Sequence, residues 1–314
     1  MKNHQKTIDI LCIGEILIDF ISHQMGQSIA ATKDYHRYLG GSPTNVAMNM
    51  SRLGLRAAIV ASVGNDGFGE YILNRLKECA INTDGIKQLD TTPTTVIFVS
   101  RTEDTPEFIP YREADAHISG DQLPETLLKS ARLFHTSCFA LSKNPAQATI
   151  LSKAKQAVQL GCTLSIDLNY SEKIWPDTQK AVTVIEEFCR LDPLIKISED
   201  DMFRLFGQHL PHEEIFHYFH RLGVTTICLT LGKKGAVLSQ KGEETLQLPA
   251  PKIKNIKDAT GAGDAFWSGF LFAWLQEKTP RKCMETALQL AALKLQNVGR
   301  IPDYTTTLSG ILNI

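Results

Sequence analysis

The chain has 314 residues, of which 43% are hydrophobic and 21% are charged, and its formal net charge at pH 7 is −1. This composition is ordinary for a globular protein, so it allows a full hydrophobic core and argues against extensive disorder. The near-zero charge excludes the basic footprint of a nucleic-acid-binding or membrane-surface protein. The seven cysteines are scattered and form no C-x-x-C pair, which predicts free thiols in a reducing, cytoplasmic compartment.

Strand-like apolar runs alternate with helix-like runs along the chain. The runs read as strands cover residues 8–13, 57–63, 95–100, 133–138, 163–167, 194–197 and 226–230. Two intervening helices, at 43–54 and 145–161, have a proline near the start and a glycine at the end. This alternation predicts an α/β fold, a doubly wound and mainly parallel sheet with helices on both faces.

Two regions interrupt the alternation, at residues 22–39 and 91–116. Both are rich in Thr, Tyr, Arg and acidic residues and show no helical period. No Pro/Gly/Ser linker encloses either region, so we expect polar strands inserted into a single domain, 1–314, where they would form a lid. The apolar stretch 8–21 contains Asp9, Glu15 and Asp19, so it reads as a buried first strand rather than a membrane span.

Polar residues follow several of the expected strands, where ligands bind in open parallel sheets. They are Gly14, Glu15 and Asp19, then Asp167 and Asn169, then residues 198–201, and finally Gly232. Gathered at one edge of a sheet they would form a site, although any one of them also suits a turn or a helix cap.

The most informative segment is residues 258–266, Asp-Ala-Thr-Gly-Ala-Gly-Asp-Ala-Phe. The small residues Gly261, Ala262 and Gly263 leave backbone N–H groups able to face an anion, and the Asp264 carboxylate lies directly beside them. A helix should begin here, since apolar residues recur with a 3.6-residue period on one face. That face comprises Phe266, Gly269, Phe270, Ala273 and Trp274, and Thr260 could supply a capping oxygen.

Three interpretations of this segment compete. It could be a tight turn followed by an acidic first turn of a helix. A dinucleotide fingerprint would need a third glycine where Phe266 stands, and a Walker A loop would need a Lys-Ser/Thr pair after the glycines. In the third interpretation, the N–H groups hold a transferring phosphoryl group while Asp264 takes the proton of the attacking hydroxyl.

Residues 40–47, Gly-Gly-Ser-Pro-Thr-Asn-Val-Ala, together with residues 258–264, resemble the two signatures of the ribokinase-like, PfkB-type carbohydrate kinases. The similarity extends over nearly the whole chain. It implies a doubly wound sheet with a small β lid and ATP-dependent phosphorylation of a sugar hydroxyl. By position, Asp264 would be the catalytic base and the Gly261–Gly263 backbone the anion hole. The sugar ligands would be Asp19, Gly40, Gly41 and Asn45.

The same resemblance implies a nucleotide side. Its residues would be Ser198, Thr230, Gly232, Gly235, Ala292 and Asn297. Mg²⁺ would arrive with the triphosphate. Asp201 could stand for the glutamate of the family's Asn-x-x-Glu stretch, and Asp258 and Thr260 fall where some members bind a monovalent cation such as K⁺. In the family, lid strands often pair between subunits, which suggests a homodimer.

The identity of the sugar depends on the segment 111–116 and on residues 165–176. Both resemble fructokinases, 5-dehydro-2-deoxygluconokinases and 2-keto-3-deoxygluconate kinases, with Arg112 and Asn169 as substrate ligands. An arginine usually stands two residues after that asparagine, but here the residue is Ser171. The missing guanidinium argues against a keto-acid substrate and favours a neutral ketose, as for a fructokinase. The other two kinases remain alternatives, and a non-catalytic sugar or nucleotide sensor is a less favoured one.

Overall fold

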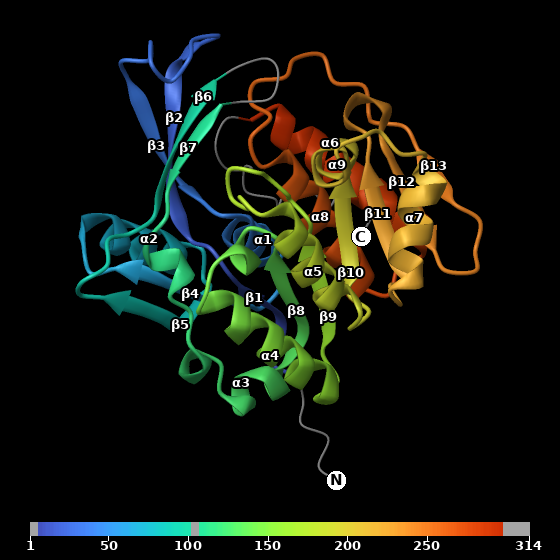
Figure 1. Cartoon of the computed structure of the whole chain (residues 1–314), viewed down its shortest axis with the longest axis horizontal. Helices are drawn as coiled ribbons and strands as arrows, with labels where there is room; N and C mark the ends of the chain where they lie inside the picture. The colour runs from blue at the N-terminus through green and yellow to red at the C-terminus, as the bar shows by residue number, and fades with distance from the viewer. Residues whose placement is uncertain (1–5, 102–106, 298–314) are drawn as a thin grey trace.

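The computed structural model describes residues 6–101 and 107–297, which form a nine-stranded sheet and a separate four-stranded sheet (Figure 1). The strands of the large sheet lie in the order β13 (Leu246–Leu248), β12 (Ala236–Gln240), β11 (Thr226–Thr230), β10 (Leu194–Ser198), β9 (Thr163–Asp167), β8 (Ala131–Ser137), β1 (Ile8–Ile13), β4 (Ala57–Gly64), β5 (Asn82–Leu89). All neighbours from β11 to β5 pair in parallel, whereas β12 and β13 are antiparallel additions. The predicted doubly wound, mainly parallel sheet is confirmed.

Helices cover both faces of this sheet. They are α1 (Ser42–Arg52), α2 (Gly67–Glu78), α3 (Glu125–Ser130), α4 (Ala146–Gln159), α5 (Thr178–Cys189), α6 (Glu199–Phe206), α7 (His212–Arg221), α8 (Ala262–Leu275) and α9 (Pro280–Leu295). Strand β1 shows why two cores form, because Leu11 and Ile13 pack with α3 to α7 whereas Ile10 and Cys12 pack with α1, α2, α8 and α9. Successive side chains of a strand point to opposite faces, so a strand buried on both sides reads as a continuous apolar run.

The small sheet is the lid, with the order β3 (Tyr35–Gly40), β2 (Leu17–Met25), β6 (Val96–Arg101), β7 (Phe108–Tyr111). It stands away from the main sheet beside α2 (Figure 1). The expectation of one buried strand over residues 8–21 is wrong, because the chain leaves the main sheet after Ile13 and enters the lid at Leu17. Both strands are apolar, so composition alone could not reveal the break between them. The run at 95–100 likewise belongs to the lid.

Sequence patterns missed the strands at the two edges of the main sheet. Strand β5 contains Asn, Thr, Asp, Lys and Gln, and most of its side chains are not buried. Strands β12 and β13 are short, and β13 has only three residues. An edge strand such as β5 or β13 has a neighbour on one side only, so it needs fewer apolar residues and gives a weaker signal.

Helix α8 carries the motif of residues 258–266 at its start. The helix begins as expected, but the proposed single apolar face is wrong, because every residue from Ala265 to Ala273 is buried. A helix that is hydrophobic all round is a core helix, enclosed here by the sheet on one side and α9 on the other. Thr260 does not cap it, and Gly261 takes that position with a left-handed φ of 75°.

The seven cysteines form no disulfide, and all but Cys79 are buried. Among the described residues, no helix is both long and apolar enough to cross a lipid bilayer.

The contact between α8 and α9 depends on Gly269. A Cβ there would lie 2.8 Å from the Thr286 carbonyl oxygen and 2.9 Å from the Ala287 Cα. We therefore expect Gly269→Ala to lower the free energy of unfolding in urea by about 1–3 kcal/mol through overpacking. Gly67→Ala is the matched control, since its Cβ would meet nothing within 4 Å. Equal stability of the two variants would contradict this account of the packing.

Candidate functional site

The start of α8 leaves backbone amides without partners. The Ala262 N–H donates to the Ala259 carbonyl (3.1 Å), whereas the N–H groups of Gly261, Gly263 and Asp264 make no hydrogen bond within the described residues. These amides lie at the positive end of the helix dipole, so they can bind an anion. Of the three residues predicted to form the anion hole, Ala262 thus has its amide already engaged.

The Asp264 carboxylate is held by the first turn of α1. Its Oδ1 accepts from the Ser42 hydroxyl at 2.7 Å and its Oδ2 from the Asn45 amide at 2.8 Å. Burial, and then the charge of Asp167, raise the pKa of Asp264 to about 6, although both hydrogen bonds and Lys196 oppose the shift. The carboxylate is therefore largely ionised at neutral pH and can still accept a proton.

Two glycines let α1 approach so closely. Gly41 has a φ of 103°, and a Cβ there would lie 2.3 Å from the Glu15 carbonyl oxygen. A Cβ on Gly40 would lie 2.1 Å from Oδ2 of Asp19, which projects from lid strand β2. Glycine at both positions thus makes room for neighbouring groups.

Glu15 fixes the start of α1 through a hydrogen bond. It is 1% exposed, and its carboxylate accepts from the Ser42 N–H (2.9 Å) and from the Ser137 hydroxyl (2.6 Å). Burial raises the pKa of Glu15 to about 8, against the opposing effect of these hydrogen bonds. Glu15 was predicted at this edge of the sheet, but its role in positioning α1 has no signal in the sequence.

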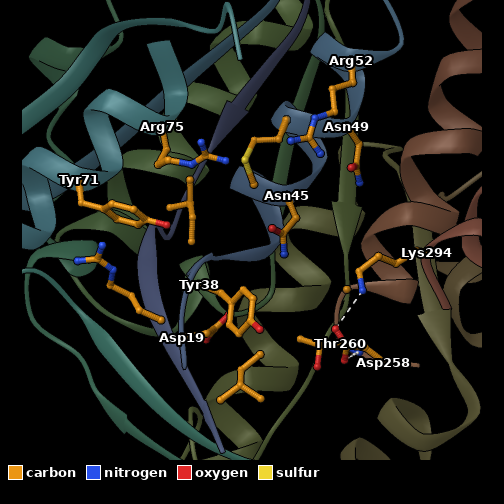
Figure 2. Close-up of a pocket in the computed structure, with 15 residues that line it drawn as sticks. Asp19, Tyr38, Asn45, Asn49, Arg52, Tyr71, Arg75, Asp258, Thr260 and Lys294 are labelled. Carbon is orange, nitrogen blue, oxygen red and sulfur yellow. Dashed lines mark hydrogen bonds and ion pairs between the residues drawn. The ribbon is translucent and has the colours of Figure 1, made fainter. Parts of the chain in front are cut away.

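A cavity of about 460 Å³, here called the lid-side cavity, opens between the lid, α1 and the loop before α8 (Figure 2). Its lining includes Asp19, Asn45, Asp258 and Thr260 of the predicted site residues. Gly40, Gly41, Arg112 and Asn169 do not line it. Burial, and then the charge of Asp264, raise the pKa of Asp19 to about 7. The lid-side cavity thus contains the Asp19 carboxylate from the lid and the Asn45 side-chain amide from α1.

The lid-side cavity also contains three arginines that the sequence analysis did not name: Arg37, Arg52 and Arg75. Arg37 comes from β3, Arg52 ends α1, and Arg75 lies in α2. The spacing of Arg52 after Asn45 could have revealed one of them, because seven residues are two turns of one helix face. No motif or spacing in the sequence links Arg37 or Arg75 to the site.

Arg112 and Asn169 each contact neighbouring groups of the protein. The Arg112 Nε donates to Asp115 Oδ2 at 2.9 Å, and its Cζ lies 4.0 Å from the centre of the Phe139 ring. Its side chain is 3% exposed. The Asn169 Oδ1 accepts from the Phe139 N–H at 3.2 Å. Both residues therefore brace the strand ends, and Arg112 is enclosed with its own carboxylate partner.

A buried lysine lies under the anion-binding amides. The Lys196 ammonium pairs with both oxygens of Asp167, at 2.9 and 3.1 Å, and would lie 3.0 Å from a Cβ built on Gly263. Burial by itself lowers the pKa of Lys196, but the charges of Asp167, Asp201 and Asp264 outweigh it and raise the pKa. Lys196 was not predicted as a site residue, although a lysine inside an apolar strand is itself a signal of a buried charge pair.

A second cavity of about 560 Å³, here called the α9 cavity, lies on the other side of the α8 start. It is lined by Thr230, Gly232, Gly235 and Ala292, all predicted for the nucleotide side, together with apolar residues that were not predicted: Ile253, Ile256, Phe266, Leu288. Ser198 and Asn297 do not line it. Ser198 caps α6, with its hydroxyl 3.0 Å from the Asp201 N–H, and the Asn297 amide donates to the Leu293 carbonyl. The family resemblance also implies a turn from Asn297 to Arg300 that flanks the adenine, and residues 298–300 of this turn lie outside the described residues.

The predicted metal ligands already have protein partners. Asp201 accepts from the Ser198 hydroxyl (2.5 Å) and from Arg204 (3.3 Å). The Asp258 carboxylate accepts from the Thr260 N–H (2.9 Å) and the Lys294 ammonium (3.2 Å). No group of three or more His, Cys, Asp or Glu side chains within the described ranges could hold a metal ion.

The two cavities therefore lie on either side of the start of α8. Gly261 lines the lid-side cavity and Gly263 lines the α9 cavity, with Asp264 directly after them in α8. An anion at the free amides would face the α9 cavity, and a hydroxyl bound beside Asn45 would face Asp264. This geometry suits transfer of a phosphoryl group from a nucleotide to an alcohol.

The fold and this site define a ribokinase-like kinase. The chain belongs to the pfkB family of carbohydrate kinases, whose family model matches residues 7–307. It is therefore an ATP-dependent carbohydrate kinase.

Three known proteins are similar to this chain over most of its length. The chain is 35% identical to an ATP-dependent 6-phosphofructokinase of Thermoanaerobacterium thermosaccharolyticum, over 95% of this chain and 91% of that protein. It is 36% identical to the fructokinase of Halothermothrix orenii, with a TM-score of 0.79 over 94% of this chain and 100% of the other. A ribokinase II of E. coli, solved with ATP and Mg²⁺, shares the fold at a TM-score of 0.85 and 23% identity, over 94% of this chain and 95% of the other.

Burial of Glu15 makes stability depend on pH. A carboxyl whose pKa rises from 4.5 when unfolded to about 8 when folded keeps its proton in the native state over that window. The unfolded state then binds fewer protons, so stability falls as pH rises, by up to about 1.4 kcal/mol per pH unit for this group. Glu15→Gln keeps an acceptor for the Ser42 N–H and should flatten the decline between pH 5 and 8 in urea unfolding. Parallel curves for the two proteins would contradict the assignment.

Proposed function

We propose that this kinase transfers the γ-phosphoryl group of ATP to a hydroxyl of a fructose-type hexose, with Asp264 as the catalytic base. The observation that carries the proposal is the position of the Asp264 carboxylate, held by Ser42 and Asn45 beside the amides of the α8 start. The hydroxyl oxygen attacks the γ-phosphorus, the bond to the β-phosphate oxygen breaks, and the proton passes to Asp264.

The free amides of Gly261, Gly263 and Asp264 receive the charge on the transferring group. Preorganised N–H donors stabilise charge that develops in a transition state, because they do not need to reorient during the reaction. The Lys196 ammonium, under Gly263, adds a fixed positive charge on the same side. A compact buried cation beside phosphoryl oxygens has the same effect.

The α9 cavity would hold the nucleoside of ATP. Its apolar wall, from Ile253 and Ile256 to Leu288 and Ala292, suits a flat base, and the glycines at 232 and 235 admit the ribose close to the backbone. Asp264 and the free amides lie at the end where the phosphates would extend.

Mg²⁺ would be held mainly by the triphosphate. This ion prefers to keep several waters and to use one or two carboxylates together with substrate phosphates. The described residues fit that mode, because they offer no cluster of three acidic or imidazole ligands and Asp201 is the carboxylate at the nearby strand end. When bound, the ion neutralises charge on the β- and γ-phosphate oxygens.

A fructose-type acceptor is supported by the names of two similar proteins, a 6-phosphofructokinase at 35% identity and a fructokinase at 36% identity. Arg112 no longer supports the choice, because its guanidinium is buried against Asp115 and does not line the cavity. No contact among residues 6–101 and 107–297 favours the alternatives, 5-dehydro-2-deoxygluconate or 2-keto-3-deoxygluconate. A cytoplasmic location, consistent with unpaired thiols, and a homodimer through the lid strands stay predictions; light scattering would test the dimer.

Asp264→Asn tests the catalytic base. The amide keeps the size of the side chain but cannot take a proton, so kcat should fall by about 10²–10⁴-fold while ATP still binds. Turnover is measured as ADP formation, and ATP binding by calorimetry. Asp84→Asn, at the exposed edge strand β5, is the matched control and should retain wild-type turnover.

The pH profile distinguishes loss of a base from damage to the fold. With a pKa of about 6, Asp264 should be protonated and inactive as a base in acid, so kcat/KM should rise with pH through about 6. The residual activity of Asp264→Asn should lack this rise. Wild-type kinetics that do not change between pH 5 and 7, or an unchanged kcat in the variant, would refute the assigned role.

Lys294 bears on the predicted K⁺ site. Its ammonium bonds to the Asp258 carboxylate and to the Asn297 carbonyl, both at 3.2 Å, so a fixed cation already stands where K⁺ was expected. We expect wild-type turnover to be equal in KCl and in tetramethylammonium chloride. Lys294→Met should be slower and partly restored by K⁺, because it leaves Asp258 without that ammonium. A wild-type enzyme that needs K⁺ would overturn this expectation.

A further inference from the structure

The lid-side cavity has an unusual charge for a site that binds a neutral sugar. Three arginines line it, Arg37, Arg52 and Arg75, and guanidinium groups stay charged at any physiological pH. Its other cation, Lys294, is paired with Asp258. Asp19 is then the single further carboxylate among the residues that line the cavity. The described lining therefore carries an excess of positive charge.

The arginines come from three separate elements and converge on one end of the cavity. Figure 2 shows Arg52 on α1 and Arg75 on α2 extending into the space between these helices. Arg37, on lid strand β3, places its Cζ 3.8 Å from the centre of the Tyr71 ring, which lies one turn before Arg75 on α2. Among the described residues, Arg37 makes no ion pair and Arg75 pairs only with Glu78, whose side chain is 58% exposed.

Helix α1 sets the distance between the arginine end of the lid-side cavity and the end at Asn45, which holds Asp264. Asn45, Asn49 and Arg52 all line the cavity and follow the spacing i, i+4, i+7 on one helix face. At a rise of 1.5 Å per residue, Asn45 and Arg52 are roughly 10 Å apart along the helix axis. Since Asn45 holds Asp264, the arginine end lies about one hexose away from the proton acceptor.

An arginine cluster at this distance needs an anion. Like charges gathered in a partly closed cavity repel one another, and a neutral sugar would add no charge to offset the positive excess of the described lining. The arginine that Ser171 replaces would belong to the Asn169 side of the site, and Asn169 does not line the lid-side cavity. The absence of that arginine therefore does not argue against an anion between α1 and α2. A phosphate monoester fits better than a carboxylate, because its dianion offers three oxygens to several guanidinium forks.

We propose that the acceptor is a hexose monophosphate, with its phosphate held by Arg37, Arg52 and Arg75 and a hydroxyl at the opposite end of the sugar facing Asp264. The proposal rests on the proposed function and specifies its substrate. The hydroxyl oxygen forms a bond to the γ-phosphorus, the bond from that phosphorus to ADP breaks, and Asp264 receives the hydroxyl proton. The products are a hexose bisphosphate and ADP.

The test compares kcat/KM for fructose 6-phosphate, fructose and 2-keto-3-deoxygluconate with ATP and Mg²⁺. We expect fructose 6-phosphate to exceed the other two by at least 100-fold. Arg75→Gln and Arg37→Gln should each reduce the ratio of fructose 6-phosphate to fructose by tenfold or more, mainly through KM. Arg221→Gln, an exposed arginine at the end of α7, is the matched control and should leave the ratio unchanged.

Each other outcome has a distinct meaning. Preference for fructose, or for the sugar acid, overturns the phosphate proposal while the kinase function stands. A ratio that the Arg75 and Arg37 variants leave unchanged overturns the assigned phosphate ligands. Absence of ADP formation with every sugar overturns the proposed function itself. In that case, calorimetry of fructose 6-phosphate and fructose without ATP still decides the inference, which fails if the phosphate ester does not bind more tightly.

Discussion

The hydrogen bonds from Ser42 and Asn45 to the Asp264 carboxylate are the interaction on which the site depends. They join residues 222 and 219 positions apart in the chain and bring the N-termini of α1 and α8 to one point. Both helices direct the positive ends of their dipoles toward this point, and α8 adds the N–H groups of Gly261, Gly263 and Asp264, which have no partner within the described residues. The carboxylate stabilises that arrangement, and the same charge makes it a proton acceptor between two cavities.

The position of α1 depends in turn on a buried acid. Glu15 accepts from the Ser42 N–H and the Ser137 hydroxyl, so it ties the first turn of α1 to the ends of β1 and β8. Gly41 permits the close approach, since any Cβ would collide with the Glu15 carbonyl. Such buried carboxylates cost desolvation energy, and the raised pKa values of Glu15, Asp19 and Asp264 are the measure of that cost. The burial that fixes the positions of these carboxyl groups therefore lowers the folding stability of the protein.

Individual residues show how far sequence patterns could lead. Thr230, Gly232, Gly235 and Ala292 were predicted together, and they line one cavity, because short motifs at strand and helix ends keep their local geometry. Arg112 was predicted as a ligand but lies buried against Asp115, since a sequence does not show which partner a charged side chain finds. Lys196 lies inside an apolar strand and was not predicted as a site residue. No sequence motif connects the three arginines of the lid-side cavity.

The sequence by itself determined the alternation of strands and helices, the glycine-rich start of α8 and the carboxylate beside it, because periodicity, helix punctuation and backbone freedom are local properties. Only the tertiary structure decided that the second strand belongs to the lid, that Glu15 positions α1, and that Arg37, Arg52 and Arg75 share one cavity. These depend on distances between segments far apart in the chain, which the packing of α1, α2 and the lid sets. The nature of the acceptor is encoded in that packing, whereas phosphoryl transfer is encoded in the motif.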